Sequence, residues 1–248
     1  MAAPQFLTPI TRVAPRPADP DNARYVRSYL LMRAAVGALG IALPVVLVLV
    51  DGLWFDGSPF PRTSLSAYYH SGVRDLMVGT ICAIGTFLLA YKVAERNLDN
   101  SLSVVAGLTV ILVALFPPRL PRGGMLSPLQ ERLGEVLCAQ LHFAAAAVFL
   151  ISLAVLSVTF GVREGNRPER AAQKLPPAFW RIYHFACAGI IAAALVFMGL
   201  SEISDFGPRT SLLIGETVSL MAFGASWLAK GFELDMLRGR PVRARAAD

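Results

Sequence analysis

The chain has 248 residues, of which 55% are hydrophobic and only 16% carry a charge. A soluble domain of this size has about a quarter charged residues, so the composition excludes a large soluble domain and indicates a membrane protein. The net charge of +6 does not indicate nucleic-acid binding, because the basic residues lie in short loops and tails beside apolar stretches.

Six apolar stretches predict an all-α fold, a polytopic bundle of six transmembrane helices. Most have about the length that a hydrocarbon core of roughly 30 Å requires. In chain order they are 34–50, 76–91, 102–116, 136–160, 182–200 and 211–229. The predicted organisation is a flexible cytoplasmic segment over 1–30, a transmembrane domain over 31–231 and a basic cytoplasmic tail over 232–248.

The positions of the basic residues predict the orientation of the bundle. With six crossings and a cytoplasmic N-terminus, 16 of the 23 Lys and Arg residues fall inside and 6 outside, with Arg33 at the inner edge. The third stretch is short, about 22 Å of helix. If it did not cross, the excess of Lys and Arg residues on the cytoplasmic side would vanish, so we keep six crossings. The prediction is a multi-pass plasma-membrane protein with both termini in the cytoplasm.

Polar residues collect in the loop between the first two predicted spans. This outer loop holds Ser66, Tyr69 and His70, and Arg74 and Asp75 follow at the start of the second span. A carboxylate is favourable at that position because it meets the positive end of a helix. Their predicted depth in the membrane therefore places these side chains together in the outer half of the bundle.

The fourth and sixth spans add two ionisable residues at similar depth. Ser127 and Gln130 form a predicted capping box, from which one helix is expected to run over 128–160 and to carry His142. The sixth span carries Glu216, and a carboxyl group inside a span usually faces a partner or a water-filled cavity. His184 lies at the cytoplasmic end, where contact with lipid headgroups is expected. The three histidines therefore cannot form one metal site.

The preferred interpretation is an outward-facing polar pocket that binds or moves a small anionic or lipid-like ligand. In this pocket Arg74 would hold an anionic group, while Glu216 and His142 would bind or relay a proton. The expected partners are membrane lipids and this ligand, without a cofactor and without nucleic acid, and the sequence does not identify a protein partner. The candidate ligand-binding residues are His70, Arg74, Asp75, His142, Glu216, Ser66 and Tyr69.

Two alternatives stay open. The first is a metal-dependent lipid hydrolase, in which His70, His142 and a carboxylate bind zinc and activate water. The carboxylate would come from Asp75 or Glu216. The second is a structural or accessory membrane subunit, in which the polar residues only hold helices together.

Two family resemblances concern these residues. The stretch 64–79 (SLSAYYHSGVRDLMVG), together with Glu216 and the ending FGASWLAKG over 223–231, resembles a family of bacterial six-span membrane proteins. That resemblance implies the fold and no activity. The Ser-x-x-x-His element from Ser66 to His70 resembles the alkaline ceramidase and progestin/adiponectin receptor superfamily, which implies a zinc-dependent hydrolase. The chain lacks the His-x-x-x-His pair that completes the zinc site in that superfamily.

Overall fold

The computed structural model describes residues 20–56, 60–90, 98–121, 123–164, 177–204 and 206–231. These residues form helices and loops without any strand, which confirms the all-α class for this part of the chain. The π-helical turn η1 and the 3-10 helix η2 are short. The elements are α1 (Pro20–Val50), η1 (Asp51–Phe55), η2 (Ser66–His70), α2 (Arg74–Leu89), α3 (Leu98–Leu115), α4 (Pro128–Leu133), α5 (Glu135–Glu164), α6 (Pro177–Ser204) and α7 (Ser211–Gly231).

Among the described residues, five helical segments are long and apolar enough to cross a membrane. They are Leu31–Phe55, Leu98–Leu115, Glu135–Arg163, Ala178–Ser204 and Ser211–Ala229. The chain is therefore compatible with an integral membrane protein. The segments coincide with five of the six predicted stretches, including the short third one. The other stretch, 76–91, falls on α2, which has 16 residues, or roughly 24 Å of helix.

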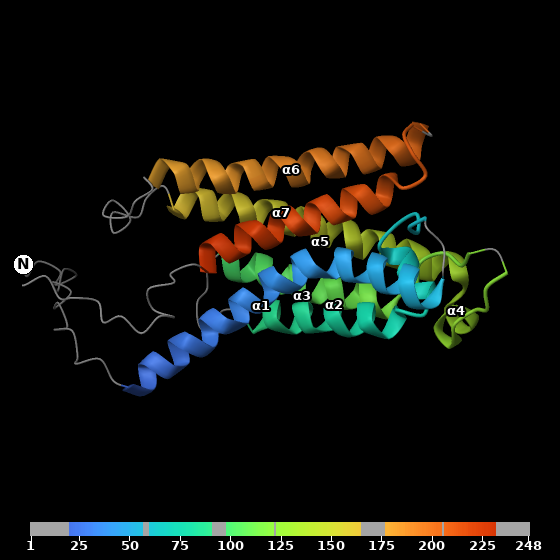
Figure 1. The fold of residues 1–248 in the computed structure, drawn as a ribbon, viewed down its shortest axis with the longest axis horizontal. Coiled ribbons are helices and arrows are strands. Elements are labelled where there is room, and N and C mark those ends of the chain that lie inside the picture. The colour runs from blue at the N-terminus through green and yellow to red at the C-terminus, as the bar shows by residue number, and fades with distance from the viewer. Residues whose placement is uncertain are drawn as a thin grey trace, which may run out of the picture.

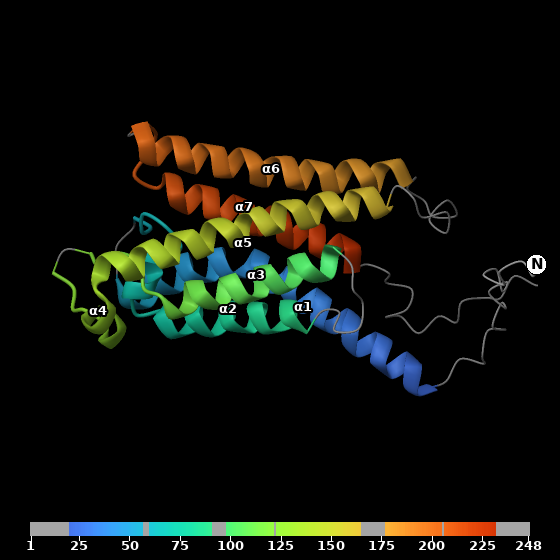
Figure 2. The same ribbon diagram turned by 180° about the vertical axis from the view of Figure 1, so that it is seen from behind.

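The long helices lie side by side and alternate in direction (Figure 1). We call the end where α1 ends and α7 begins the loop end, and the opposite end, where α1 begins and α7 ends, the terminal end. The short α4 lies at the loop end beside the start of α5 (Figure 2). Neighbouring pairs are α1–α2, α2–α3, α3–α5, α5–α7 and α7–α1, so these five helices surround a common centre. The sixth long helix, α6, packs on α5 and α7, on the side of the bundle away from α2 (Figures 1 and 2).

Glycines set the closest helix contacts, as small residues do in membrane bundles. A Cβ on Gly224 of α7 would lie 2.7 Å from the carbonyl oxygen of Gly37 in α1. A Cβ on Gly107 of α3 would lie 2.8 Å from the carbonyl oxygen of Gly85 in α2. The backbones at both crossings are thus too close for any side chain. In Figure 1, α1 and α7 meet toward the terminal end and diverge toward the loop end.

The prediction of a single helix over 128–160 is wrong, because the helix is interrupted at Gly134. This residue has φ +89°, a conformation that side chains disfavour, and it separates α4 from α5. The predicted capping box at the start of α4 is confirmed, with reciprocal bonds between Ser127 and Gln130. Asp75 lies in the first turn of α2, as expected.

Only part of the predicted domain organisation can be compared with the described residues. α1 begins at Pro20, within the segment expected over 1–30. Residues 1–19 and the tail over 232–248 lie outside the described residues. Six further basic residues, in the loops between the helices, also lie outside the described residues: Lys92, Arg96, Arg122, Arg167, Arg170 and Lys174.

Replacing Gly224 by Ala should destabilise the bundle by about 1–3 kcal/mol, because the new methyl group meets the Gly37 carbonyl oxygen. Gly189 in α6 is the matched control, since a Cβ there meets nothing within 4 Å. Ala at that position should leave stability unchanged or raise it by up to about 1 kcal/mol through helix propensity. Unfolding by dodecyl sulfate in mixed micelles measures both. Equal stability of the two variants would contradict the close crossing.

Candidate functional site

A cavity lies at the centre of the five-helix ring, in its loop-end half. It has about 60 Å³ open to water-sized molecules, enough to hold several waters or one small apolar group. Two of the lining residues are polar, Ser66 and Glu216, and the rest are apolar. The lining residues are Leu43, Leu47, Leu65, Ser66, Met77, Ile81, Ile84, Val110, Val113, Ala146, Phe149, Leu150, Glu216 and Leu220.

Glu216 joins α7 to the loop before α2. Its Oε2 accepts a 2.6 Å hydrogen bond from the backbone N–H of Leu65. Its Oε1 accepts a 3.2 Å bond from the Ser66 hydroxyl. The loop presents these donors because it turns into η2, where Ser64 Oγ accepts from the N–H of Ala67 and leaves the Leu65 N–H free for the carboxylate. A carboxyl group that faces an apolar cavity is costly unless it is bonded in this way.

Ser66 also contacts His142 of α5. The distance from His142 Nε2 to Ser66 Oγ is 2.8 Å. On the other side of the imidazole ring, His142 Nδ1 lies 2.7 Å from the carbonyl oxygen of Phe116 and 3.1 Å from that of Val113. His142 is fully buried, so one chain of polar contacts runs from α7 through the loop and α5 to the end of α3.

The loop is held in place by further contacts at its two ends. The N–H of Leu213, at the start of α7, donates to the carbonyl oxygen of Thr63 over 3.0 Å. Arg62 forms an ion pair with the buried Asp51, with 2.7 Å between Nε and Oδ2. The guanidinium of Arg62 lies over the ring of Tyr68, and burial raises the pKa of that phenol, which keeps it neutral. These contacts therefore hold the loop in place independently of Glu216.

The other predicted site residues lie around this network and do not line the cavity. His70 Nε2 lies 3.2 Å from the carbonyl oxygen of Pro118. Arg74 is exposed and donates to the Tyr69 hydroxyl over 2.8 Å. Asp75 is also exposed. The structure thus brings together Ser66, His142 and Glu216. It places Arg74 and Asp75 at the surface, whereas Tyr69 is buried and His70 is half-buried, both outside the cavity wall.

Sequence reasoning missed the backbone groups of the site. The Leu65 N–H and the carbonyl oxygens of Val113 and Phe116 are invisible in side-chain patterns. One signal was available for the carbonyl oxygens. Pro117 and Pro118 follow Phe116 and end α3, and a helix end leaves carbonyl groups without helical partners.

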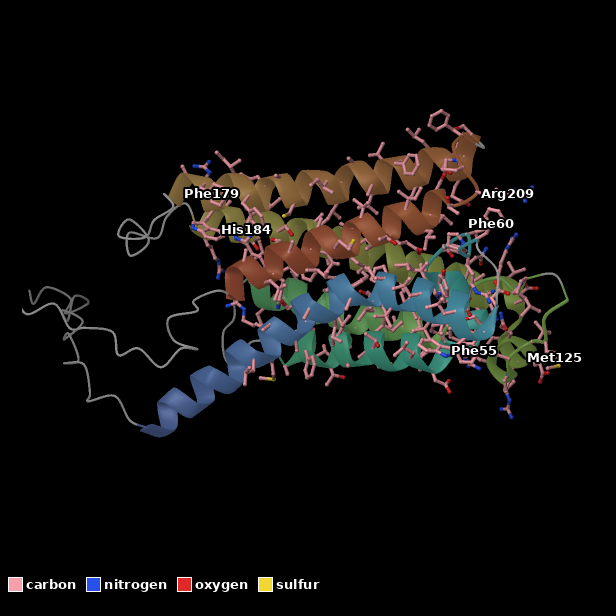
Figure 3. All side chains as sticks on the ribbon, viewed as in Figure 1. Phe55, Phe60, Met125, Phe179, His184 and Arg209 are labelled. Carbon is pink, nitrogen blue, oxygen red and sulfur yellow. The ribbon has the colours of Figure 1, made fainter. Side chains whose placement is uncertain are left out.

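The described residues contain no group of three or more His, Cys, Asp and Glu side chains placed to hold a metal ion. His184 is remote from the site, at the opposite end of the bundle from Phe55, Phe60 and Arg209 (Figure 3). Its expected contact with lipid headgroups is wrong, because the ring is buried and its Nδ1 lies 2.8 Å from Ser226 Oγ of α7. The separation of the histidines along the bundle agrees with the sequence prediction.

Comparison with known proteins gives no assignment. No protein-family model matches the chain, and no curated protein and no solved structure matches it either.

Replacing Glu216 by Ala should destabilise the bundle by about 1–3 kcal/mol, because the buried N–H of Leu65 loses its acceptor. Glu202 at the end of α6 is exposed, and its replacement by Ala should change stability by less than about 0.5 kcal/mol. Unfolding in mixed micelles compares the two variants. A Glu216 variant as stable as the Glu202 variant would show that the carboxyl contacts do not stabilise the fold.

Proposed function

We propose that this protein is a multi-pass membrane protein that binds a small amphiphilic ligand in the central cavity. The ligand has an apolar body and a head that donates a hydrogen bond, such as an alcohol or an amine. The observation that supports this proposal is the distribution of polarity in the cavity. Its wall is apolar except at one place, where Glu216 and Ser66 meet.

The charges around the cavity favour a donor head over an anionic one. The cavity wall contains a carboxyl group, and Arg74, the residue expected to hold an anion, is exposed and bonded to Tyr69. An anion in the cavity would meet Glu216 without a compensating cation, and an unpaired buried charge is costly. A hydroxyl or ammonium group would instead find an acceptor.

A groove on the outside of α1 and α7 lies close to the cavity, and we propose it as the place where such a ligand first meets the protein. It has about 430 Å³ and lies between the loop-end halves of α1 and α7, where these helices diverge. Pro44 and Val48 line it from α1, and Leu213 and Thr217 line it from α7. Thr217 directly follows Glu216, so the groove and the cavity lie on two sides of the same helix segment.

Acyl transfer at Ser66 has less support than ligand binding. The Ser66–His142 distance of 2.8 Å would suit a nucleophile and its base. However, the Leu65 N–H, the adjacent donor that could stabilise an oxyanion, is already bonded to Glu216. A carboxylate beside the nucleophile would also repel the negative charge that develops on the substrate.

We further propose six crossings, with α2 as the additional span, and a plasma-membrane location with both termini in the cytoplasm. The alternation of helix directions supports this arrangement, because the start of α1 and the end of α7 lie at the same end of the bundle (Figure 1). The excess of Lys and Arg predicted beside that end supports the cytoplasmic side. The resemblance to bacterial six-span proteins remains part of this proposal.

Photolabelling of the protein in nanodiscs tests ligand binding, with a diazirine derivative of butanol as the probe, because the cavity holds only a small ligand. We expect saturable labelling of the cavity wall that butanol reduces and butyrate does not. Replacing Leu150 by Trp fills the cavity and should weaken labelling about tenfold, which corresponds to about 1.4 kcal/mol of binding energy.

Ile151 provides the matched control, because it neighbours Leu150 but is exposed on the outside of α5. Trp at this position should leave labelling unchanged. Saturable labelling that is equal in both variants would place the binding site elsewhere. Competition by butyrate as strong as that by butanol would overturn the donor-head assignment.

A further inference from the structure

We infer that Glu216, Ser66 and His142 form one proton-binding site, in which a single proton is shared between the carboxyl group and the imidazole through the serine hydroxyl. The inference goes beyond ligand binding, because it depends only on the hydrogen-bond geometry and requires no ligand in the cavity.

The first step concerns His142. Its Nδ1 contacts the carbonyl oxygens of Phe116 and Val113, and a carbonyl oxygen only accepts hydrogen bonds. Nδ1 must therefore carry a hydrogen. In the neutral ring this leaves Nε2 as an acceptor, and Nε2 faces Ser66 Oγ.

The second step counts hydrogens between the three side chains. The contacts Nε2–Oγ and Oγ–Oε1 need one hydrogen each, but Ser66 supplies only one. The other must reside on Glu216 or on His142 Nε2. An ionised Glu216 beside a neutral His142 would leave one contact between two acceptors and a net negative charge in the cavity wall.

The shared proton has two arrangements that contain the same atoms. In one, the Glu216 carboxylic acid donates to Ser66 Oγ, and the Ser66 hydroxyl donates to His142 Nε2. In the other, the imidazolium donates to Ser66 Oγ, and the hydroxyl donates to the Glu216 carboxylate. Moving the proton from Oε1 to Oγ and the hydroxyl proton from Oγ to Nε2 converts the first into the second. Both are neutral in total charge, and both leave Oε2 to accept from the Leu65 N–H.

The surroundings isolate this proton from other charges. Among the described residues, the helices that face Glu216 across the cavity present apolar side chains, such as Leu47 of α1, Met77 of α2 and Val110 of α3. His70 is a further titratable group of the loop, and its Nε2 lies 3.2 Å from the carbonyl oxygen of Pro118. The Arg62–Asp51 ion pair lies in the same loop and is mutually compensated. In the described part of the chain, no charged side chain beside the cavity therefore compensates for the loss of this proton.

A ligand that donates a hydrogen bond would compete with the shared proton. When the proton is present, every contact of the network has its hydrogen. When it leaves, Glu216 or His142 becomes an acceptor without a donor, and an alcohol or ammonium head can fill that place. Ligand uptake should accordingly release one proton.

Spectroscopy of the ligand-free protein in nanodiscs at neutral pH counts the protons directly. Infrared difference spectra against Glu216→Gln report whether the Glu216 carboxyl is protonated. Nitrogen NMR of labelled histidine reports the protonation of His142, and with three histidines in the chain the signals can be assigned with a His142→Gln variant. We expect one proton in total, either a carboxylic acid with a neutral ring or a carboxylate with an imidazolium.

A carboxylate with a neutral ring, or a carboxylic acid with an imidazolium, would overturn the inference. A Ser66→Ala variant should separate the two groups, so that the carboxyl and ring signals change at different pH values. Ser66→Thr keeps the hydroxyl and should retain a single joint change, which serves if the Ala variant does not fold. Absence of butanol binding together with one shared proton would reject the proposed function and leave this inference standing.

Discussion

The hydrogen bonds of one carboxyl group inside the bundle organise its loop-end half. Glu216 projects from α7 into an apolar cavity, where a carboxyl group is stable only if its oxygens are bonded. The donors are Leu65 and Ser66 in the loop before α2. Ser66 in turn contacts His142 of α5. Two carbonyl oxygens at the end of α3 complete this set of contacts. One polar residue thus ties together elements that are far apart in the sequence.

The helix packing explains why there is room for such a site. At the Gly37–Gly224 crossing the backbones of α1 and α7 touch, which fixes one point of the pair. Because the two helices cross at an angle, they separate toward the loop end (Figure 1). The loop over residues 63–66 enters that space, bonded to α7 through Leu213 and Glu216. The cavity lies beneath the loop, closed by apolar residues of five helices.

The sequence allowed the helical class, five of the apolar segments and the shared depth of Ser66, His142 and Glu216 to be predicted, because these follow from hydrophobic length and helix rise. It did not allow the finer geometry to be predicted. Arg74 and Asp75 have the right depth, but the face of α2 that carries them points away from the cavity. The break at Gly134 depends on a positive φ that no periodicity reveals. The burial of His184 depends on its partner Ser226, which lies on another helix.

A double-mutant cycle between Ser66 and Glu216 tests most directly whether the network acts as one unit. The free energies of unfolding of Ser66→Ala, Glu216→Ala and the double variant would be measured in mixed micelles. Side chains that share a hydrogen-bond network show coupling energies of about 0.5–3 kcal/mol, and we expect the double variant to lose less stability than the two single losses combined. Additive losses, within the error of the measurement, would show that Glu216 and Ser66 act independently and would contradict the account given above.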